Sequence, residues 1–278
     1  MTQQDMDIED PVQKPVQTEA PLTAREEWEE FLKTALIAIL LALAIRTFYL
    51  EPFNIPSGSM EPTLEIGDYL FVYKPSYGYS RYSFPFGFAP IEDRIWTGGR
   101  EPQRGDVVVF KLPSDPSIDY IKRVVGLPGD TIQVKQGRLY INHKKVDRES
   151  LGLQNVQENG RPVTEYIETL PGGVRHRIYE ISDNDPLDNT GEFIVPEDHY
   201  FCMGDNRDNS QDSRVLGHDG MPAPVGYVPL ENIVGRASFI FFSTNGSANL
   251  AEIWKWPWTV RYGRLFHFIQ HGSTSTEK

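Results

Sequence analysis

The chain lacks the features of a disulfide-stabilised, zinc-binding or nucleic-acid-binding protein. It has one cysteine, Cys202, so no disulfide can form within it, and we expect this residue to be a small buried thiol. No His-Glu-x-x-His zinc motif occurs. No segment carries the dense Lys/Arg face that neutralises phosphates, and the net charge is −12, so nucleic acid is not an expected partner.

Large apolar residues are scarce at the N-terminus, where acidic residues are abundant. Residues 1–30 contain nine Asp or Glu against Lys14 and Arg25, so this segment carries −7 of the net charge. A segment of this composition cannot bury enough apolar surface to fold alone. We therefore expect residues 1–27 to be an acidic disordered tail, and we expect residues 271–278 to be disordered as well.

A long apolar run follows the tail. Residues 31–50 are mostly Ala, Leu and Ile, with charges only at Lys33 and Arg46. Twenty helical residues rise about 30 Å, the hydrocarbon thickness of a bilayer, so we predict a single transmembrane anchor over residues 28–50. The alternative is a cleaved signal peptide, because the small-x-small sequence at 42–44 resembles a cleavage site. The acidic residues before the run favour the anchor.

The charges that flank this run predict its orientation. Lys14, Arg25 and Lys33 stand before it or at its start, and Arg46 and Lys74 stand at its end or beyond. By the positive-inside rule this small difference favours a cytoplasmic N-terminus, which would put the rest of the chain on the outer face of the membrane.

Beyond the anchor, the helical period gives way to short β-rich runs bounded by Gly, Pro and Asp. The segments 135–137 and 171–173 are typical of hairpin turns. The pattern predicts a mainly β fold, in which the transmembrane helix is followed by an antiparallel β domain over 51–270, with ribbons or loops inserted at 75–103 and about 143–190. The expected strands are 69–73, 106–112, 119–125, 131–134, 138–142, 163–170, 174–181, 192–195, 199–203 and 233–242.

A turn shortly after the anchor is a candidate for a nucleophile. In Pro56-Ser57-Gly58-Ser59 the proline favours extended backbone before it, and the glycine permits a close backbone approach, so Ser59 lies on a tight turn. The same four residues are also ordinary loop sequence. A serine hydroxyl is a weak nucleophile unless a base lies within hydrogen-bond reach.

Lys122 is the candidate base. It stands within the apolar run 119–125, where burial would lower its pKa. A free lysine is less than about 0.1% neutral at pH 7, so the pKa must fall by roughly 2 to 3 units for the amine to act as a base. The alternative is a strand-edge lysine that is exposed to solvent or paired with Asp119 or Asp130.

Histidine, the usual base, is the weaker candidate. All six histidines stand beside charged residues or near the C-terminus, so we expect them on the surface or in loops, and a Ser-His-Asp triad is not predicted. They are His143, His176, His199, His218, His267 and His271.

Three further segments accompany the serine turn. They are 104–110, 119–130, which contains Lys122 and ends in a Pro-Gly-Asp turn, and 204–214, a dense polar loop. With the Ser59 turn and the anchor, these ordered motifs resemble the bacterial type I signal peptidases (leader peptidases), membrane-bound serine proteases that remove signal peptides from exported proteins. The resemblance covers about residues 28–265.

The resemblance implies a role for each matched residue. Ser59 would be the nucleophile and Lys122 the general base, and the amide of Ser59 and the hydroxyl of Ser57 would form the oxyanion hole.

The polar loop would orient the lysine. The resemblance implies that Ser210 hydrogen-bonds the ammonium group and that Asp212 and Arg214 brace the loop by an ion pair. Asp205 and Arg207 would belong to the same surrounding shell. The alternative for such a run of Asp, Asn and Arg is a solvated turn.

The resemblance also implies the substrate. Shallow S1 and S3 pockets would accept Ala-x-Ala, so the expected activity is cleavage of preproteins after small-x-small, without a metal or cofactor. The edges of the strands beside the dyad would hold the extended substrate. The residues that match the pocket walls are Ile55, Pro56, Met60, Leu64, Tyr120 and Ile121.

The expected location is the bacterial inner membrane, crossed once, with the β catalytic domain on the periplasmic or extracytoplasmic face. Expected partners are preprotein signal peptides and membrane lipid, and the export machinery is a candidate. The chain departs from some family members, which have a disulfide or two anchors. The aromatic and basic segment 254–268 either dips into the membrane interface or packs on the β core.

Two other classes of protein stay open on the residues alone. One is a non-catalytic, membrane-tethered β module that binds partners. The other is a Ser-Lys self-cleaving regulator, which normally carries a DNA-binding helix-turn-helix; no such segment is recognisable before residue 55.

Overall fold

The computed structural model describes residues 23–269, except 85–90, 92, 97, 159, 216, 218–222 and 249–250. The expected disordered segments lie outside the described residues, apart from 23–27. The chain divides into two compact units, residues 1–42 and residues 43–278.

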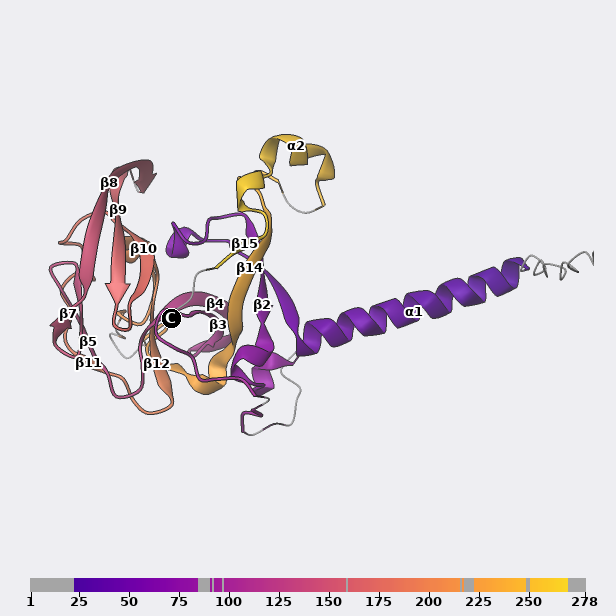
Figure 1. The fold of residues 1–278 in the computed structure, drawn as a ribbon, viewed down its shortest axis with the longest axis horizontal. Coiled ribbons are helices and arrows are strands. Elements are labelled where there is room, and N and C mark those ends of the chain that lie inside the picture. Colours follow the sequence, from indigo (N-terminus) through magenta and orange to yellow (C-terminus); the bar gives the residue numbers. More distant parts are fainter. Residues whose placement is uncertain are drawn as a thin grey trace, which may run out of the picture. The chain divides into compact units, whose positions relative to one another are not determined.

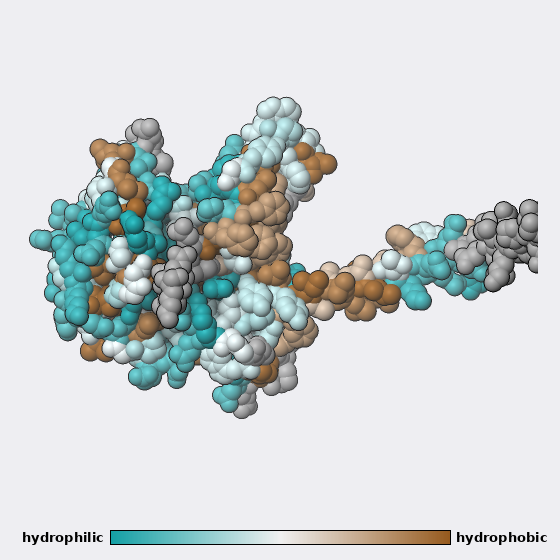
Figure 2. Space-filling model, in the orientation of Figure 1, coloured by the Kyte–Doolittle hydropathy of each residue, from teal (hydrophilic) through white to brown (hydrophobic). Residues whose placement is uncertain are grey.

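Helix α1 (Ala24–Phe48) begins at Ala24, where the sequence predicted a disordered tail up to residue 27. The cause is a capping box. The amide and hydroxyl of Thr23 each donate to Glu26 Oε2 at 2.8 Å, and Glu26 N donates to Thr23 Oγ1 at 3.4 Å. The helix is long and apolar enough to cross a membrane. Figure 2 shows its apolar side chains, in brown, along much of its length.

The rest of the described chain is mainly antiparallel β structure, which confirms the predicted fold class (Figure 1). The largest sheet has eight strands in the order β1-β2-β14-β3-β4-β12-β13, with β15 paired to β14. Its strands are β1 (Leu50–Asn54), β2 (Asp68–Tyr73), β3 (Val107–Leu112), β4 (Asp115–Gly126), β12 (His199–Met203), β13 (Val228–Pro229), β14 (Ile233–Ser243) and β15 (His267–Phe268).

Two smaller sheets complete the described part of the β structure. One has the order β11-β5-β6-β7, and the other has the order β10-β9-β8. The hairpins predicted at 135–137 and 171–173 are confirmed, since β5 pairs with β6 and β9 with β10. Their strands are β5 (Thr131–Lys135), β6 (Arg138–Ile141), β7 (Lys144–Lys145), β8 (Asp147–Glu158), β9 (Arg161–Leu170), β10 (Val174–Glu180) and β11 (Phe193–Ile194).

Each of the ten predicted runs overlaps a strand, but the prediction missed β1, β7, β8, β13 and β15. Residue 50, the first of β1, was assigned to the end of the anchor. β8 is a polar run without alternation, and it is held by its ladder with β9, in which Asp147 faces Thr169. Short helix α2 (Trp256–Thr259) was also missed.

Two segments are rich in aromatic residues: the predicted insertion at 75–103, and residues 254–268, which were expected either to pack on the β core or to dip into the membrane interface. In the first, Tyr77 is fully buried and its hydroxyl donates to Asp106 at 2.8 Å. In the second, the ring of Trp256 packs on Phe242, with centroids 4.7 Å apart, while Trp258 is exposed. The C-terminal segment therefore packs part of its aromatic surface on the β domain and leaves the rest exposed to solvent.

Strand β4 lies between two apolar cores, and this placement sets up the site. Successive side chains of a strand point to opposite faces. Ile121 packs on the core formed around Val109, and Val124 belongs to the core that contains Val108. Lys122 shares the face of Val124, so its stem runs through a dry layer of the protein.

Candidate active site

The turn that carries Ser59 connects β1 to β2. Ser57 is extended, and Gly58–Met60 form a single 3-10 turn whose residues are all buried. A backbone hydrogen bond from Ile55 N to Asp68 O, 2.8 Å long, ties the approach to the turn onto β2. Ser59 is 8% exposed, and the Oγ of Ser57 lies 3.4 Å from its Oγ. The turn therefore presents two hydroxyls at one point.

Lys122 reaches this turn from β4. Its Nζ lies 2.7 Å from the Oγ of Ser59 and 3.0 Å from the carbonyl oxygen of Ile121. The residue is 3% exposed, and Nζ lies 5.2 Å from the ring centroid of Tyr120. The amine is thus enclosed and in hydrogen-bond contact with the serine hydroxyl.

Burial dominates the protonation of Lys122. It lowers the pKa to about 8 from the ordinary 10.5, while the charge of Asp212 acts in the opposite direction. Arg214 lies 2.9 Å from that carboxylate and forms an ion pair with it. Asp212 is therefore balanced by its own partner. At a pKa of about 8, roughly a tenth of the amine is neutral at pH 7.

The two carboxylates that were considered as partners of Lys122 are engaged elsewhere. Asp119 lies 2.9 Å from the Nζ of Lys111, and Asp130 lies 2.8 Å from the guanidinium of Arg104. The structure thus has a buried amine in place of the exposed or ion-paired lysine that was the alternative.

The polar loop after β12 meets the serine turn through its backbone. Asn206 N donates to Ser59 O at 3.1 Å, and its Nδ2 donates to Gly58 O at 3.1 Å. Gly204 permits this approach, because a Cβ there would lie 2.5 Å from Ser59 O and 2.2 Å from the Oγ of Ser210. The loop and the turn are therefore in direct contact.

Ser210 does not make the hydrogen bond expected of it. Its Oγ is buried and has no hydrogen-bond partner within the described part of the chain. The hydroxyl faces the side of Gly204 where a Cβ would stand, and Lys122 bonds to Ser59 and Ile121 instead.

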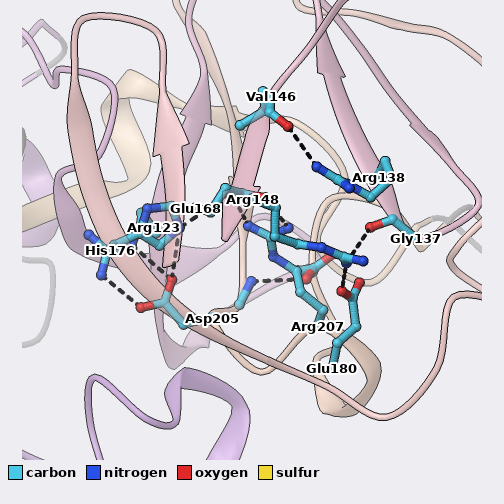
Figure 3. A network of polar contacts seen from close by, with 12 residues as sticks. Arg123, Gly137, Arg138, Val146, Arg148, Glu168, His176, Glu180, Asp205 and Arg207 are labelled. Carbon is cyan, nitrogen blue, oxygen red and sulfur yellow. Dashed lines mark hydrogen bonds and ion pairs between the residues drawn. The ribbon is translucent and has the colours of Figure 1, made fainter. Parts of the chain in front are cut away.

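Asp205 and Arg207 pair with residues that the sequence did not single out. Arg123, which directly follows Lys122, binds Asp205 through Nε at 2.8 Å and Nη2 at 2.7 Å. Arg207 binds Glu168 of β9 through both terminal nitrogens. Figure 3 shows these groups gathered in one network. The sequence could have indicated a buried ion pair for Arg123, because this charged residue stands inside the apolar run 119–125. No comparable pattern in the sequence marks Glu168.

His176 corrects the expectation that all the histidines lie on the surface or in loops. It is 4% exposed on β10, where strand alternation points it inward while its two arginine neighbours point outward. Its Nε2 lies 3.4 Å from Glu168 and 3.9 Å from Asp205. Burial, and then the charge of Arg123, lower its pKa to about 4. His143 and His267 are exposed, His199 is half-buried, and His218 and His271 lie outside the described residues.

A cleft of about 480 Å³ opens beside Ser59 and Lys122. Of the expected wall residues, four line it: Ile55, Pro56, Tyr120 and Ile121.

Met60 and Leu64 do not line this cleft, which corrects the sequence prediction. Both are fully buried in the core beneath it, Met60 as the last residue of the 3-10 turn and Leu64 in the segment that follows the turn. Asn209 and Gln211, which the sequence reasoning missed, line the cleft from the polar loop. The hydroxyl of Tyr120 donates to Gln211 Oε1 at 3.1 Å across its rim.

One edge of β4 is open where it passes the cleft. β12 pairs with β4 only from Arg123 to Gly126. Among the described strands, none pairs with the cleft-side edge of residues 120–122. An extended peptide has room to add there as a further strand.

Cys202 is fully buried, as expected, and burial raises the pKa of its thiol, so it is not a nucleophile candidate. In the part of the chain that the structure describes, no group of three or more His, Cys, Asp or Glu side chains is placed to hold a metal ion.

Comparison with known proteins gives a consistent result. Residues 28–242 match the model of the family described as signal peptidase, peptidase S26. The chain is 43% identical to signal peptidase I of Rickettsia conorii over 88% of this chain and 92% of that protein. It is 42% identical to signal peptidase I of Rickettsia typhi over 90% of this chain and 95% of that protein. A crystal structure of a signal peptidase I from Enterococcus faecalis aligns with a TM-score of 0.29 at 25% identity, covering 49% of this chain and 97% of that one.

Proposed function

Because this chain belongs to the signal peptidase family S26, a family of serine peptidases that remove signal peptides, we propose that Ser59 and Lys122 are its catalytic dyad. The observation that carries the proposal is the 2.7 Å contact between the Nζ of Lys122 and the Oγ of Ser59 in a buried site. The pKa of about 8 supports it, since a neutral amine is required of a base.

In the proposed reaction, the neutral amine of Lys122 accepts the proton of the Ser59 hydroxyl as Oγ attacks the scissile carbonyl carbon. The resulting ammonium then donates that proton to the leaving amine, which leaves an acyl ester on Ser59. Lys122, neutral again, takes a proton from the water that attacks this ester and returns it to the Oγ of Ser59 as the acid product leaves.

The developing oxyanion would be held by the amide of Ser59 and the hydroxyl of Ser57. The 3.4 Å separation of the two hydroxyls supports this role, because it keeps the Ser57 donor beside the attacking atom. An oxyanion donor of this kind contributes about 3 to 4 kcal/mol to the transition state.

We also propose that the cleft selects Ala-x-Ala. Ile55 and Ile121 supply branched apolar walls, which would admit a methyl group and crowd larger side chains. The free edge of residues 120–122 would pair with the substrate backbone and so align the scissile bond. Rejection by such a pocket amounts to about 1 to 3 kcal/mol per added methylene.

The proposal extends to the placement of the chain. α1 would remain as the single anchor in a bacterial inner membrane, with the N-terminus in the cytoplasm and the β catalytic domain, residues 51–270, on the outer face. Preproteins would then meet the dyad where they leave the bilayer, and the export machinery is a candidate neighbour there.

Cleavage of a purified preprotein by the full chain in detergent tests the dyad. We expect Ser59→Ala and Lys122→Ala to abolish cleavage, because each removes one of the two groups that move the proton. Lys135→Ala, at an exposed lysine on β5, should leave the rate unchanged. Cleavage that persists in either dyad variant would contradict the assignment.

A further inference from the structure

The sheet β8-β9-β10 is attached to the polar loop through backbone groups. Tyr179 N, on β10, donates to Asp205 O at 2.9 Å. The carboxylate of Asp208 accepts hydrogen bonds from Ile181 N at 2.6 Å and from Ser182 N at 3.1 Å, just after β10 ends. The loop that meets the serine turn therefore depends for part of its backbone position on a sheet whose described residues do not line the cleft.

Buried side chains strengthen this attachment. Glu168 on β9 binds the guanidinium of Arg207, with one contact of 2.8 Å. His176 on β10 faces the carboxylates of both Glu168 and Asp205. Figure 3 shows Glu168 and His176 pointing into the same cluster as Arg123 and Asp205.

The cluster reaches both members of the dyad. Asp205 binds Arg123, the residue next to Lys122 on β4. Asn206, the residue next to Asp205, donates to Ser59 O. A shift of this one part of the loop would thus be transmitted to the base and to the nucleophile.

We propose that Glu168 and His176 are positioning residues, which hold the polar loop so that Lys122 and Ser59 stay aligned. Glu168 acts through its charge on Arg207. His176 acts as a neutral spacer between Glu168 and Asp205, because four charged groups already face it and balance one another. These are Glu168 from β9, Asp205 and Arg207 from the loop, and Arg123 from β4. The proposal rests on the proposed function of the dyad.

The β9 strand offers a matched control. Glu165 and Glu168 are both 2% exposed, but Glu165 pairs with Arg177 of β10, within the sheet itself. Glu165→Gln and Glu168→Gln therefore remove the same charge from the same strand, and only the second breaks a link to the loop.

We would measure preprotein cleavage by the full chain in detergent, with melting temperatures and with kcat and KM resolved across pH. Glu168→Gln should lower kcat by about 10-fold to 100-fold while KM stays within about twofold, because misplacing the reacting groups affects the transition state more than binding. It should also move the inflection of the kcat–pH profile, because the surroundings of Lys122 change. Glu165→Gln should keep the wild-type kcat and profile.

Equal kcat and pH profiles for the two variants would overturn the proposal, whatever their melting temperatures. If Glu168→Gln does not fold, Glu168→Asp keeps the charge and withdraws it by one methylene, and an unchanged kcat there would be equally decisive. The proposed function fails separately, namely if wild type does not cleave the preprotein or if Ser59→Ala still does.

Discussion

At the scale of single residues, the chemistry depends on placing a lysine where burial disfavours its charged form. Lys122 is enclosed by the apolar cores on β4 and by the ring of Tyr120, and burial is the largest influence on its pKa. Asp212 is the carboxylate that most strongly favours the charged amine, and its ion pair with Arg214 weakens this effect. A reactive amine therefore costs the folded protein stability at neutral pH.

Lys122→Met should make the protein inactive and more stable. The folded pKa of about 8 lies below the ordinary 10.5. The buried ammonium therefore lowers the free energy of unfolding by its full amount below pH 8, and this loss disappears as the pH rises to 10.5. A difference of about 2.5 pKa units corresponds to roughly 3 kcal/mol. We expect the free energy of unfolding at pH 7 to rise by on the order of 1 to 3 kcal/mol.

Denaturant unfolding at pH 7 and pH 10 checks this prediction, because the gain should shrink at the higher pH. Lys135→Met, at an exposed position, should change the unfolding free energy by less than about 0.5 kcal/mol. A Lys122→Met protein that is less stable than wild type at pH 7 would show that burial of the Lys122 ammonium does not destabilise the folded protein.

At the scale of elements, the site depends on how closely the polar loop approaches the serine turn. Gly204→Ala would put a Cβ 2.5 Å from Ser59 O, a backbone atom that cannot rotate away. We expect kcat to fall by about 100-fold, because the turn must shift to make room. Gly191→Ala is the control, since nothing lies within 4 Å of a Cβ there. Equal kcat values for the two variants would contradict the close contact.

The β10 strand should make stability depend on pH through His176. Its folded pKa of about 4 lies below the ordinary 6.5, so between these values the unfolded chain takes up a proton that the folded chain does not. Wild-type stability should therefore fall as pH drops from 6.5 to 4, by on the order of 3 kcal/mol from this residue.

His176→Gln, which stays neutral at every pH, should lose this part of the pH dependence. Unfolding free energies of the two proteins across pH 4 to 7 measure the difference. Parallel curves would mean that the histidine ionises as freely in the folded protein as in the unfolded one.

At the scale of the whole molecule, local patterns in the sequence predicted most of the fold. The apolar run and the β-rich runs report a period and a composition, which are properties of neighbouring residues, and the mainly β architecture with its N-terminal helix is confirmed. Polar β8 was missed because its ladder with β9, a tertiary contact, holds it in place.

The surroundings of the dyad were less predictable, because they depend on contacts between distant segments. Glu168 and Arg207 are 39 positions apart, and neither belongs to a pattern that names the other. His176 was predicted to be exposed because it stands between two arginines, but the alternation of side chains along β10 points it inward. Ser210 has the expected place in the loop, yet its hydroxyl faces Gly204. Rotamers and registers of this kind are fixed by packing, which residue types alone do not encode.

The pH dependence of kcat/KM for preprotein cleavage tests most directly whether a neutral Lys122 is the base. We expect the rate constant to rise about tenfold per pH unit below pH 8 and to level off above the pKa of about 8, as the amine loses its proton. A profile that is flat from pH 6 to pH 9, or that inflects near the ordinary pKa of histidine, would contradict a lysine base.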